Sequence, residues 1–140
     1  MTELYAEPDF EVLAVDALKA AGAVTALVPA DAIATKLRAS WRAGQPALRI
    51  RRIGGLPTEQ AAQHLVRGRL QIEAYAGDEG DAFAIAQQAD LALRAMPGTY
   101  PGAVVTTVRK DLAFTNSPDP DSDSARFVFG VVLYAHGAAA

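Results

Sequence analysis

Apolar and polar residues repeat along the chain with two different periods, and these periods predict its helices and strands. In two segments the apolar residues recur every three to four positions, as in amphipathic helices. The first segment begins after Asp9 and ends at Gly22. The second begins in the acidic segment 77–81 and ends before Pro97. Acidic residues at a helix start favour its dipole, so both helices have plausible boundaries.

Alternating apolar and polar residues predict strands at 46–53, 64–76, 102–115 and 125–137, and a short strand at 32–37. The strand at 64–76 is apolar on one side and polar on the other. Its polar side comprises Arg67, Arg69, Gln71, Glu73 and Tyr75. The last two strands are joined by an acidic turn at 116–124.

The order of these elements predicts an α+β fold. Short links join a helix, three strands, a second helix and two further strands. Such an order favours a mainly antiparallel sheet of four to five strands with two principal helices packed on it. A chain of 140 residues has the usual size of one domain, so we expect residues 1–140 to form a single domain.

The last strand, 125–137, is apolar on both of its faces. Phe127, Phe129 and Val131 lie on one face, and Val128 and Val132 lie on the other. A strand of this kind must be covered on both sides. Either helices cover both faces, or one face meets another subunit.

Composition argues against several classes of function. The formal net charge of −3 and the pI of about 5.3 disfavour general attraction to DNA phosphates. The chain has no cysteine, which removes disulfides, thiolate nucleophiles and cysteine zinc sites. The first 20 residues do not resemble a secretory signal, and no apolar run approaches the roughly 20 residues of a membrane span.

The acidic turn resembles the start of a calcium loop. Asp119, Asp121 and Asp123 stand at alternate positions, where their oxygens could surround a hard cation. A calcium loop then requires Gly at its sixth position and Glu at its twelfth, where this chain has Ser124 and Gly130. We therefore expect a solvated hairpin turn, and no metal or cofactor.

No other motif predicts catalysis. The two histidines, His64 and His136, lie on different predicted strands, and no nucleophile turn accompanies either of them. The pair Gly54–Gly55 lacks the lysine and the spacing of a phosphate-binding loop, so it is expected to form a turn.

Arginines gather on two adjacent predicted strands and form the strongest candidate for an interaction surface. Paired as a hairpin, the strands would concentrate up to five cations, which could contact phosphates or the carboxylates of a partner. The alternative is an exposed sheet face whose charge is balanced by Glu59, Glu73 and solvent. The residues concerned are Arg49, Arg51, Arg52, Arg67 and Arg69.

Five segments, in this order, resemble a known family. They are DFEVLAVDALK, PALRIRRIGG, RGRLQIEAYAGD, DAFAIAQQADLALRAM and RFVFGVVL. The most telling piece is the strand RLQIEAYA, which leads almost directly into the helix DEGDAFAIAQQA. Together they resemble the tail terminator or tail-completion proteins of long-tailed bacteriophages, and the resemblance covers almost the whole chain.

The resemblance implies a structural virion protein of the tail and neck, assembled in the host cytoplasm. Members of this family form a ring, usually a hexamer, at the head-proximal end of the tail tube. The ring ends polymerisation of the tail tube protein and offers a docking surface to the head–tail connector proteins, while the genome DNA passes through without specific binding. The family is not enzymatic, and no cofactor or membrane is implied.

The same resemblance suggests roles for two groups of residues. A subunit or tube interface would be formed by Arg49, Arg51, Arg67, Arg69, Glu73 and Tyr75. An acidic loop facing the lumen, which would repel DNA, would be formed by Asp119, Asp121 and Asp123. On this interpretation Arg69→Glu and Tyr75→Ala impair ring closure and leave the monomer folded, because both side chains face away from the apolar side of their strand.

Three alternatives remain open at this point. The chain could be a head–tail adaptor or head-completion protein of the same neck, which the sequence pattern does not distinguish from a terminator. It could be a small nucleic-acid-binding module that uses the arginine-rich hairpin, with binding that weakens steeply as salt rises. The least favoured alternative is a small enzyme, since histidine is scarce and cysteine is missing.

Overall fold

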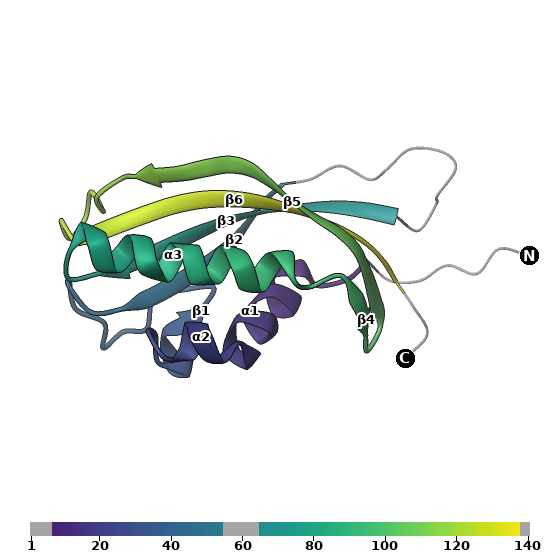
Figure 1. Ribbon diagram of the computed structural model, residues 1–140, viewed down its shortest axis with the longest axis horizontal. Coiled ribbons are helices and arrows are strands. Elements are labelled where there is room, and N and C mark those ends of the chain that lie inside the picture. The colour runs from purple at the N-terminus through teal and green to yellow at the C-terminus, as the bar shows by residue number, and fades with distance from the viewer. Residues whose placement is uncertain (1–6, 55–64, 138–140) are drawn as a thin grey trace, which may run out of the picture.

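The computed structural model describes residues 7–54 and 65–137 of the chain. They form one curled sheet of six strands, with three α-helices on one side of it (Figure 1). Across the sheet the strand order is β1-β2-β3-β6-β5-β4. Strand pairing is antiparallel except between β1 and β2. The α+β prediction is confirmed, with one strand more than expected.

The helices are α1 (Phe10–Ala20), α2 (Gly22–Thr25) and α3 (Glu79–Arg94), and a 3₁₀ turn spans Ala30–Ala32. The strands are β1 (Ile33–Ala34), β2 (Ala47–Gly54), β3 (Leu65–Ala76), β4 (Gly98–Tyr100), β5 (Ala103–Asn116) and β6 (Ala125–Gly137).

Both predicted helices begin at an aspartate that caps them. The Asp9 side chain accepts a hydrogen bond from the Val12 N–H at 3.1 Å, and Asp78 accepts one from the Asp81 N–H at 2.8 Å. A carboxylate at this position satisfies one of the N–H groups that the first helical turn leaves without a partner.

Strand β3 is the centre of the sheet and pairs with β2 on one side and with β6 on the other. Its apolar side chains alternate toward the helices, as the sequence predicts, and they form the core with those of β6. Leu70, Ile72, Ala74, Phe129, Val131 and Leu133 are all fully buried there.

Gly68 of β3 allows the start of α1 to pack closely on the sheet. The aromatic ring of Phe10, the first residue of α1, lies directly over this glycine. A Cβ at position 68 would be only 2.5–2.8 Å from three carbons of the ring. The missing side chain at position 68 therefore lets the ring of Phe10 pack against the strand backbone.

Short elements differ from the sequence expectation. The strand predicted at 32–37 contracts to Ile33–Ala34, and it pairs parallel to β2. Helix α2 and strand β4 are not expected from the pattern at all. Elements of two to four residues complete only one or two periods of the hydrophobic repeat, which is too few for periodicity to reveal them. Position 64, where the predicted third strand begins, lies outside the described residues.

Strand β5 is long and irregular. It pairs with β6 along its length, but β4 pairs with only its first three residues. Its register against β6 shifts between Val105 and Thr107, between Lys110 and Leu112, and again between Leu112 and Thr115. Bulges of this kind bend a strand and increase its twist, which accounts for the curled shape of this side of the sheet (Figure 1).

Candidate functional site on the outer face of the sheet

The polar side chains of the sheet gather on the face turned away from the helices, which we call the outer sheet face. Cross-strand pairing brings them together: Arg49 of β2 lies opposite Glu73 of β3, and Arg51 lies opposite Gln71. Paired residues of neighbouring strands point to the same side, so charges of opposite sign become neighbours. The group consists of Arg49, Arg51, Arg67, Arg69, Gln71, Glu73, Tyr75 and Arg126.

Glu73 organises most of this group into one network, the Glu73 cluster. Its Oε2 accepts from Arg49 Nη2 at 2.6 Å, from the Tyr75 hydroxyl at 2.6 Å and from Arg126 Nη1 at 3.2 Å. Its Oε1 accepts from Gln71 Nε2 at 3.2 Å and is paired with Arg51 Nη2 at 3.2 Å. The cluster thus joins β2, β3 and β6 through a single carboxylate.

The network keeps Glu73 ionised although its side chain is fully buried. Burial alone raises the pKa of Glu73, but the hydrogen bonds from Tyr75 and Arg49 outweigh burial and hold this pKa below its usual value. Burial and the hydrogen bond to Glu73 raise the pKa of Tyr75 to about 12. Burial lowers the pKa of Arg49, but the hydrogen bond and charge of Glu73 reverse that effect and raise it. The site is therefore a cluster of paired charges held together by hydrogen bonds, and it includes one un-ionised tyrosine.

Two members of the predicted interface are hidden inside the chain. Glu73 and Tyr75 have 0% exposure, whereas the sequence pattern placed them in a row open to solvent or to a partner. The segment between β1 and β2 folds onto the outer sheet face, where Trp41 meets Tyr75 edge to face at 5.3 Å. Tyr75→Ala would remove a buried aromatic ring, so we no longer expect that variant to leave the monomer intact.

Arg69 remains available at the surface. Its side chain is 52% exposed and its Nε lies 2.9 Å from Asp111 Oδ2 of β5. This ion pair crosses β6 above Gly130, where a Cβ would be 2.5 Å from Asp111 Oδ1. Arg51 is also 46% exposed, and Arg67 is half-buried. These three arginines are the part of the predicted interface that a partner can reach.

The acidic turn is a compact structure whose three aspartates differ. Asp119 is buried: its Oδ2 accepts from the Ser122 hydroxyl at 2.5 Å, and its main chain bonds to Ser124 and Asp123. Asp121 and Asp123 are exposed. The inward position of Asp119 follows from these local hydrogen bonds, so only the other two aspartates can face a lumen.

The arginine patch is smaller than the hairpin pattern suggested. Arg52 points to the helix side, where its Nη2 lies 2.7 Å from Glu7 Oε1 and its guanidinium stands over the Phe10 ring. Of the four arginines left on the outer sheet face, Arg49 and Arg51 bind Glu73, and Arg69 binds Asp111. Guanidiniums already bound to carboxylates are poorly arranged for phosphate. Glu59 lies outside the described residues.

Three residues of this site were not identified from the sequence: Arg126, Asp111 and Trp41. Arg126 is the second residue of β6 and donates from Nε to the Ser117 carbonyl at 2.8 Å, so it ties the acidic turn to Glu73. Its charge interrupts an otherwise apolar strand, and this break in the pattern is a sequence signal that Arg126 has a charged partner in the fold. Trp41 is the single tryptophan of the chain and lies in a predicted loop, where a large aromatic ring usually covers something.

Two hollows and one histidine are the other features of the described surface considered for chemistry. Two shallow hollows, of about 360 and 470 Å³, are lined mainly by alanine and other apolar residues. Among residues 7–54 and 65–137, no three acidic or histidine side chains are grouped to hold a metal ion. His136 Nδ1 lies 3.0 Å from the carbonyl oxygen of Gly137. Within the same ranges, none of the helices has the length and apolarity to cross a membrane.

Fold and site define a small α+β protein whose sheet has one helix-covered face and one charged face. Residues 14–134 match the protein family described as Tail completion protein gp17. The chain belongs to this family, and it is a structural protein of the phage tail and neck.

The fold also recurs in a solved virion structure. A chain of the "Virion of native gene transfer agent (GTA) particle" superposes with a TM-score of 0.76 at 13% sequence identity. The match covers 91% of this chain and 95% of that chain. A search of curated protein sequences gives no match. The structural similarity at this low identity supports the fold, and the family assignment rests on the sequence match.

Proposed function

We propose that this protein forms a closed ring at the head-proximal end of the tail tube. The ring would end polymerisation of the tail tube protein and provide the docking surface for the head–tail connector. Family membership supports the location, and one observation supports ring formation: the helices cover only one face of the sheet. On the outer sheet face, Val132 and Tyr134 of β6 are half-buried and lie opposite Arg69 and Arg67 of β3. Apolar side chains beside charged ones suit a subunit contact.

Within such a ring we place Arg51, Arg67 and Arg69 at the contact with a neighbouring subunit or with the tube. Their long, partly exposed side chains suit the polar rim of an interface. Asp121 and Asp123 would face the bore, where their charge repels the phosphates of the passing genome. The function is structural, and no reaction is assigned to the chain.

Location and assembly can be tested separately. Gold-labelled antibody against the chain, applied to intact particles in the electron microscope, should decorate the junction between head and tail. Label along the tail shaft or over the capsid would contradict the proposal. Mass photometry of the purified chain should show a discrete closed oligomer, and the resemblance leads us to expect six copies.

A further inference from the structure

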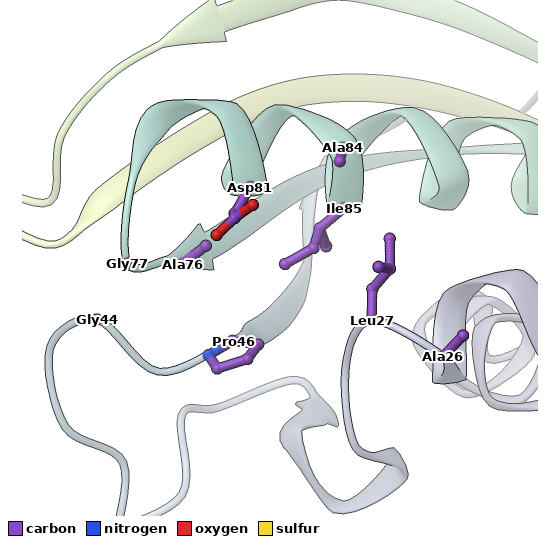
Figure 2. A pocket seen from close by; sticks show the side chains of 9 residues that line it. All are labelled: Ala26, Leu27, Gly44, Pro46, Ala76, Gly77, Asp81, Ala84 and Ile85. Atoms are coloured by element: carbon purple, nitrogen blue, oxygen red, sulfur yellow. The ribbon is translucent and has the colours of Figure 1, made fainter.

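One of the two hollows is an apolar groove with an acidic rim. It lies where β3 turns into α3 and has a volume of about 360 Å³. Leu27 and Ile85 point toward one another on one side of it, and Pro46 faces them from the other side (Figure 2). Leu27 is 40% exposed. The groove therefore has an apolar floor with no cover from the described chain.

One wall of this groove carries negative charge. Asp81 contributes its carboxylate to the wall (Figure 2). Asp78, the N-cap of α3, and Glu79 precede Asp81 in the chain and are also exposed. None of these three carboxylates takes part in the ion pairs found among the described residues. A suitable occupant would present an apolar side chain flanked by positive charges.

The chain carries such a feature on its outer sheet face, at the far end of β2. Ile53 is 44% exposed and lies in the bulge between Arg52 and Gly54. Arg51 is two residues away, and Arg69 pairs with Gly54 across the strands. The side chains of both arginines are about half exposed. We call this feature, Ile53 with Arg51 and Arg69, the isoleucine knob.

A single copy cannot fill its own groove. Pro46 of the groove and Ile53 of the knob stand seven positions apart along an extended strand, which corresponds to about 23 Å. Pro46 directly precedes β2 and Ile53 lies near its other end, so groove and knob lie toward opposite ends of this strand. Two different surfaces at opposite ends produce a head-to-tail contact, which closes into a ring or continues as a filament.

We propose that the groove binds the isoleucine knob of a second copy of this chain, with Asp81 facing the knob arginines. Opposite charges and exposed apolar side chains on the two surfaces support the second copy as the occupant. The inference rests on the proposed ring and names the contact that closes it. It adds the groove residues, which the sequence did not indicate, to the arginines placed at the interface.

Cysteine cross-linking tests this contact directly, because the native chain has no cysteine. In a chain carrying both Ile53→Cys and Ala84→Cys, mild oxidation should give a ladder of disulfide-linked oligomers that reductant returns to monomer. A disulfide requires Cα atoms within about 7 Å, so the two cysteines of one copy cannot join. The matched control, Ile53→Cys with Ala20→Cys in the other hollow, should give no ladder.

The possible outcomes separate the contact from the proposed function. Two outcomes would overturn the knob-and-groove contact. One is an equal amount of disulfide-linked oligomer in both double-cysteine variants, and the other is no such oligomer in the variant with Ile53→Cys and Ala84→Cys. If mass photometry still shows a closed oligomer in that case, the proposed ring is retained and its subunits meet through other surfaces. Absence of label at the head–tail junction would instead contradict the proposed function, whatever the cross-linking shows.

A charge exchange provides the second measurement. Arg69→Glu and Asp81→Arg, each alone, should raise the dissociation constant of self-association about tenfold, because each places like charges face to face. The double variant restores opposite charges and should recover most of the lost affinity. If the double variant associates no better than the single variants, Arg69 and Asp81 do not meet. Unfolding curves followed by Trp41 fluorescence verify that each variant is folded.

Discussion

At the residue scale, the Glu73 carboxylate decides how the outer sheet face is built. Three guanidiniums, a phenol and an amide converge on it. A buried charge is tolerated only when it is paired and hydrogen-bonded, and Glu73 meets both conditions. Its partners come from three strands, so the cluster fixes the strands and the acidic turn relative to one another.

The ionisation of Glu73 makes stability depend on pH in the acid range. The pKa of Glu73 is lowered in the folded chain from an ordinary value of 4.5. Its contribution to the free energy of unfolding is therefore present above pH 4.5 and is lost as pH falls through the folded pKa. Glu73→Gln should lower the free energy of unfolding by about 2–3 kcal/mol at pH 7. This difference should shrink as the pH falls below 4.5.

Urea unfolding followed by Trp41 fluorescence measures this effect at several pH values. Glu79→Gln serves as the control, since it changes an exposed carboxylate and should alter stability by no more than about 0.5 kcal/mol. A difference between the wild type and Glu73→Gln that stays constant from pH 7 to pH 3 would contradict the assignment of Glu73 as an ionised, stabilising group.

Tyr75 provides a second titration, at the alkaline end. Its pKa is raised to about 12, so one of the four tyrosines should ionise late in a titration followed by absorbance at 295 nm. Tyr75→Phe should remove that late component. The raised pKa stabilises the fold below pH 10, and this stabilisation is lost as pH rises toward 12. A late component that persists in Tyr75→Phe would assign the shifted phenol to another residue.

At the element scale, two contacts seat the helices on the sheet. Phe10 places the start of α1 on Gly68, and Asp90 ties α3 to β5. Asp90 is buried, and its Oδ2 lies 3.3 Å from Lys110 Nζ and 3.0 Å from Arg94 Nη2. The Lys110 ammonium also stands 3.5 Å above the centre of the Phe114 ring. An ion pair and a cation–π contact therefore hold the irregular part of β5 beneath α3.

The close packing of the Phe10 ring on Gly68 predicts that a larger residue at position 68 destabilises the fold. Gly68→Ala should lower the free energy of unfolding by about 1–3 kcal/mol, because its Cβ would overlap the Phe10 ring and force it to move. Gly22→Ala is the matched control: no atom lies within 4 Å of a Cβ there, and its φ is not in the left-handed region. The control should be neutral or stabilising by up to about 1 kcal/mol. Equal losses in both variants would contradict the proposed packing.

The sequence predicts the long helices and strands well. It does not predict which segments pack on the outer sheet face. Alternation in β3 correctly separates its helix-facing side chains from Arg69, Glu73 and Tyr75. It cannot show that a loop bearing Trp41 returns to pack on Tyr75, because that contact joins segments more than thirty positions apart. The same limit applies to Asp119, whose inward position depends on hydrogen bonds within the turn.

At the scale of the whole molecule, most arginines of the described residues form ion pairs with carboxylates. The formal net charge is −3, and the exposed aspartates of the acidic turn remain unneutralised in the ion pairs found among the described residues. Long-range repulsion of nucleic acid follows from such a balance. This agrees with a ring through which a genome passes.

The prediction is that the chain does not bind double-stranded DNA. A gel-shift experiment at low salt should show no complex at about 1 μM protein, the lower end of the usual range of non-specific dissociation constants. Asp121→Asn with Asp123→Asn raises the formal net charge from −3 to −1 and should increase any residual binding at higher protein concentration. A tight complex whose affinity falls steeply with salt would instead favour the nucleic-acid-binding alternative.

The irregular pairing of β5 has a consequence for the ring proposed above, in which several copies lie close together. Beyond Val105 no described strand covers its outer edge, and a straight edge of that length would be a template for fibril growth. Three register shifts against β6 bend and twist the strand, so that its outer edge is not straight. In the proposed ring this would keep neighbouring copies from joining edge to edge, and recognition between them would rest on side chains.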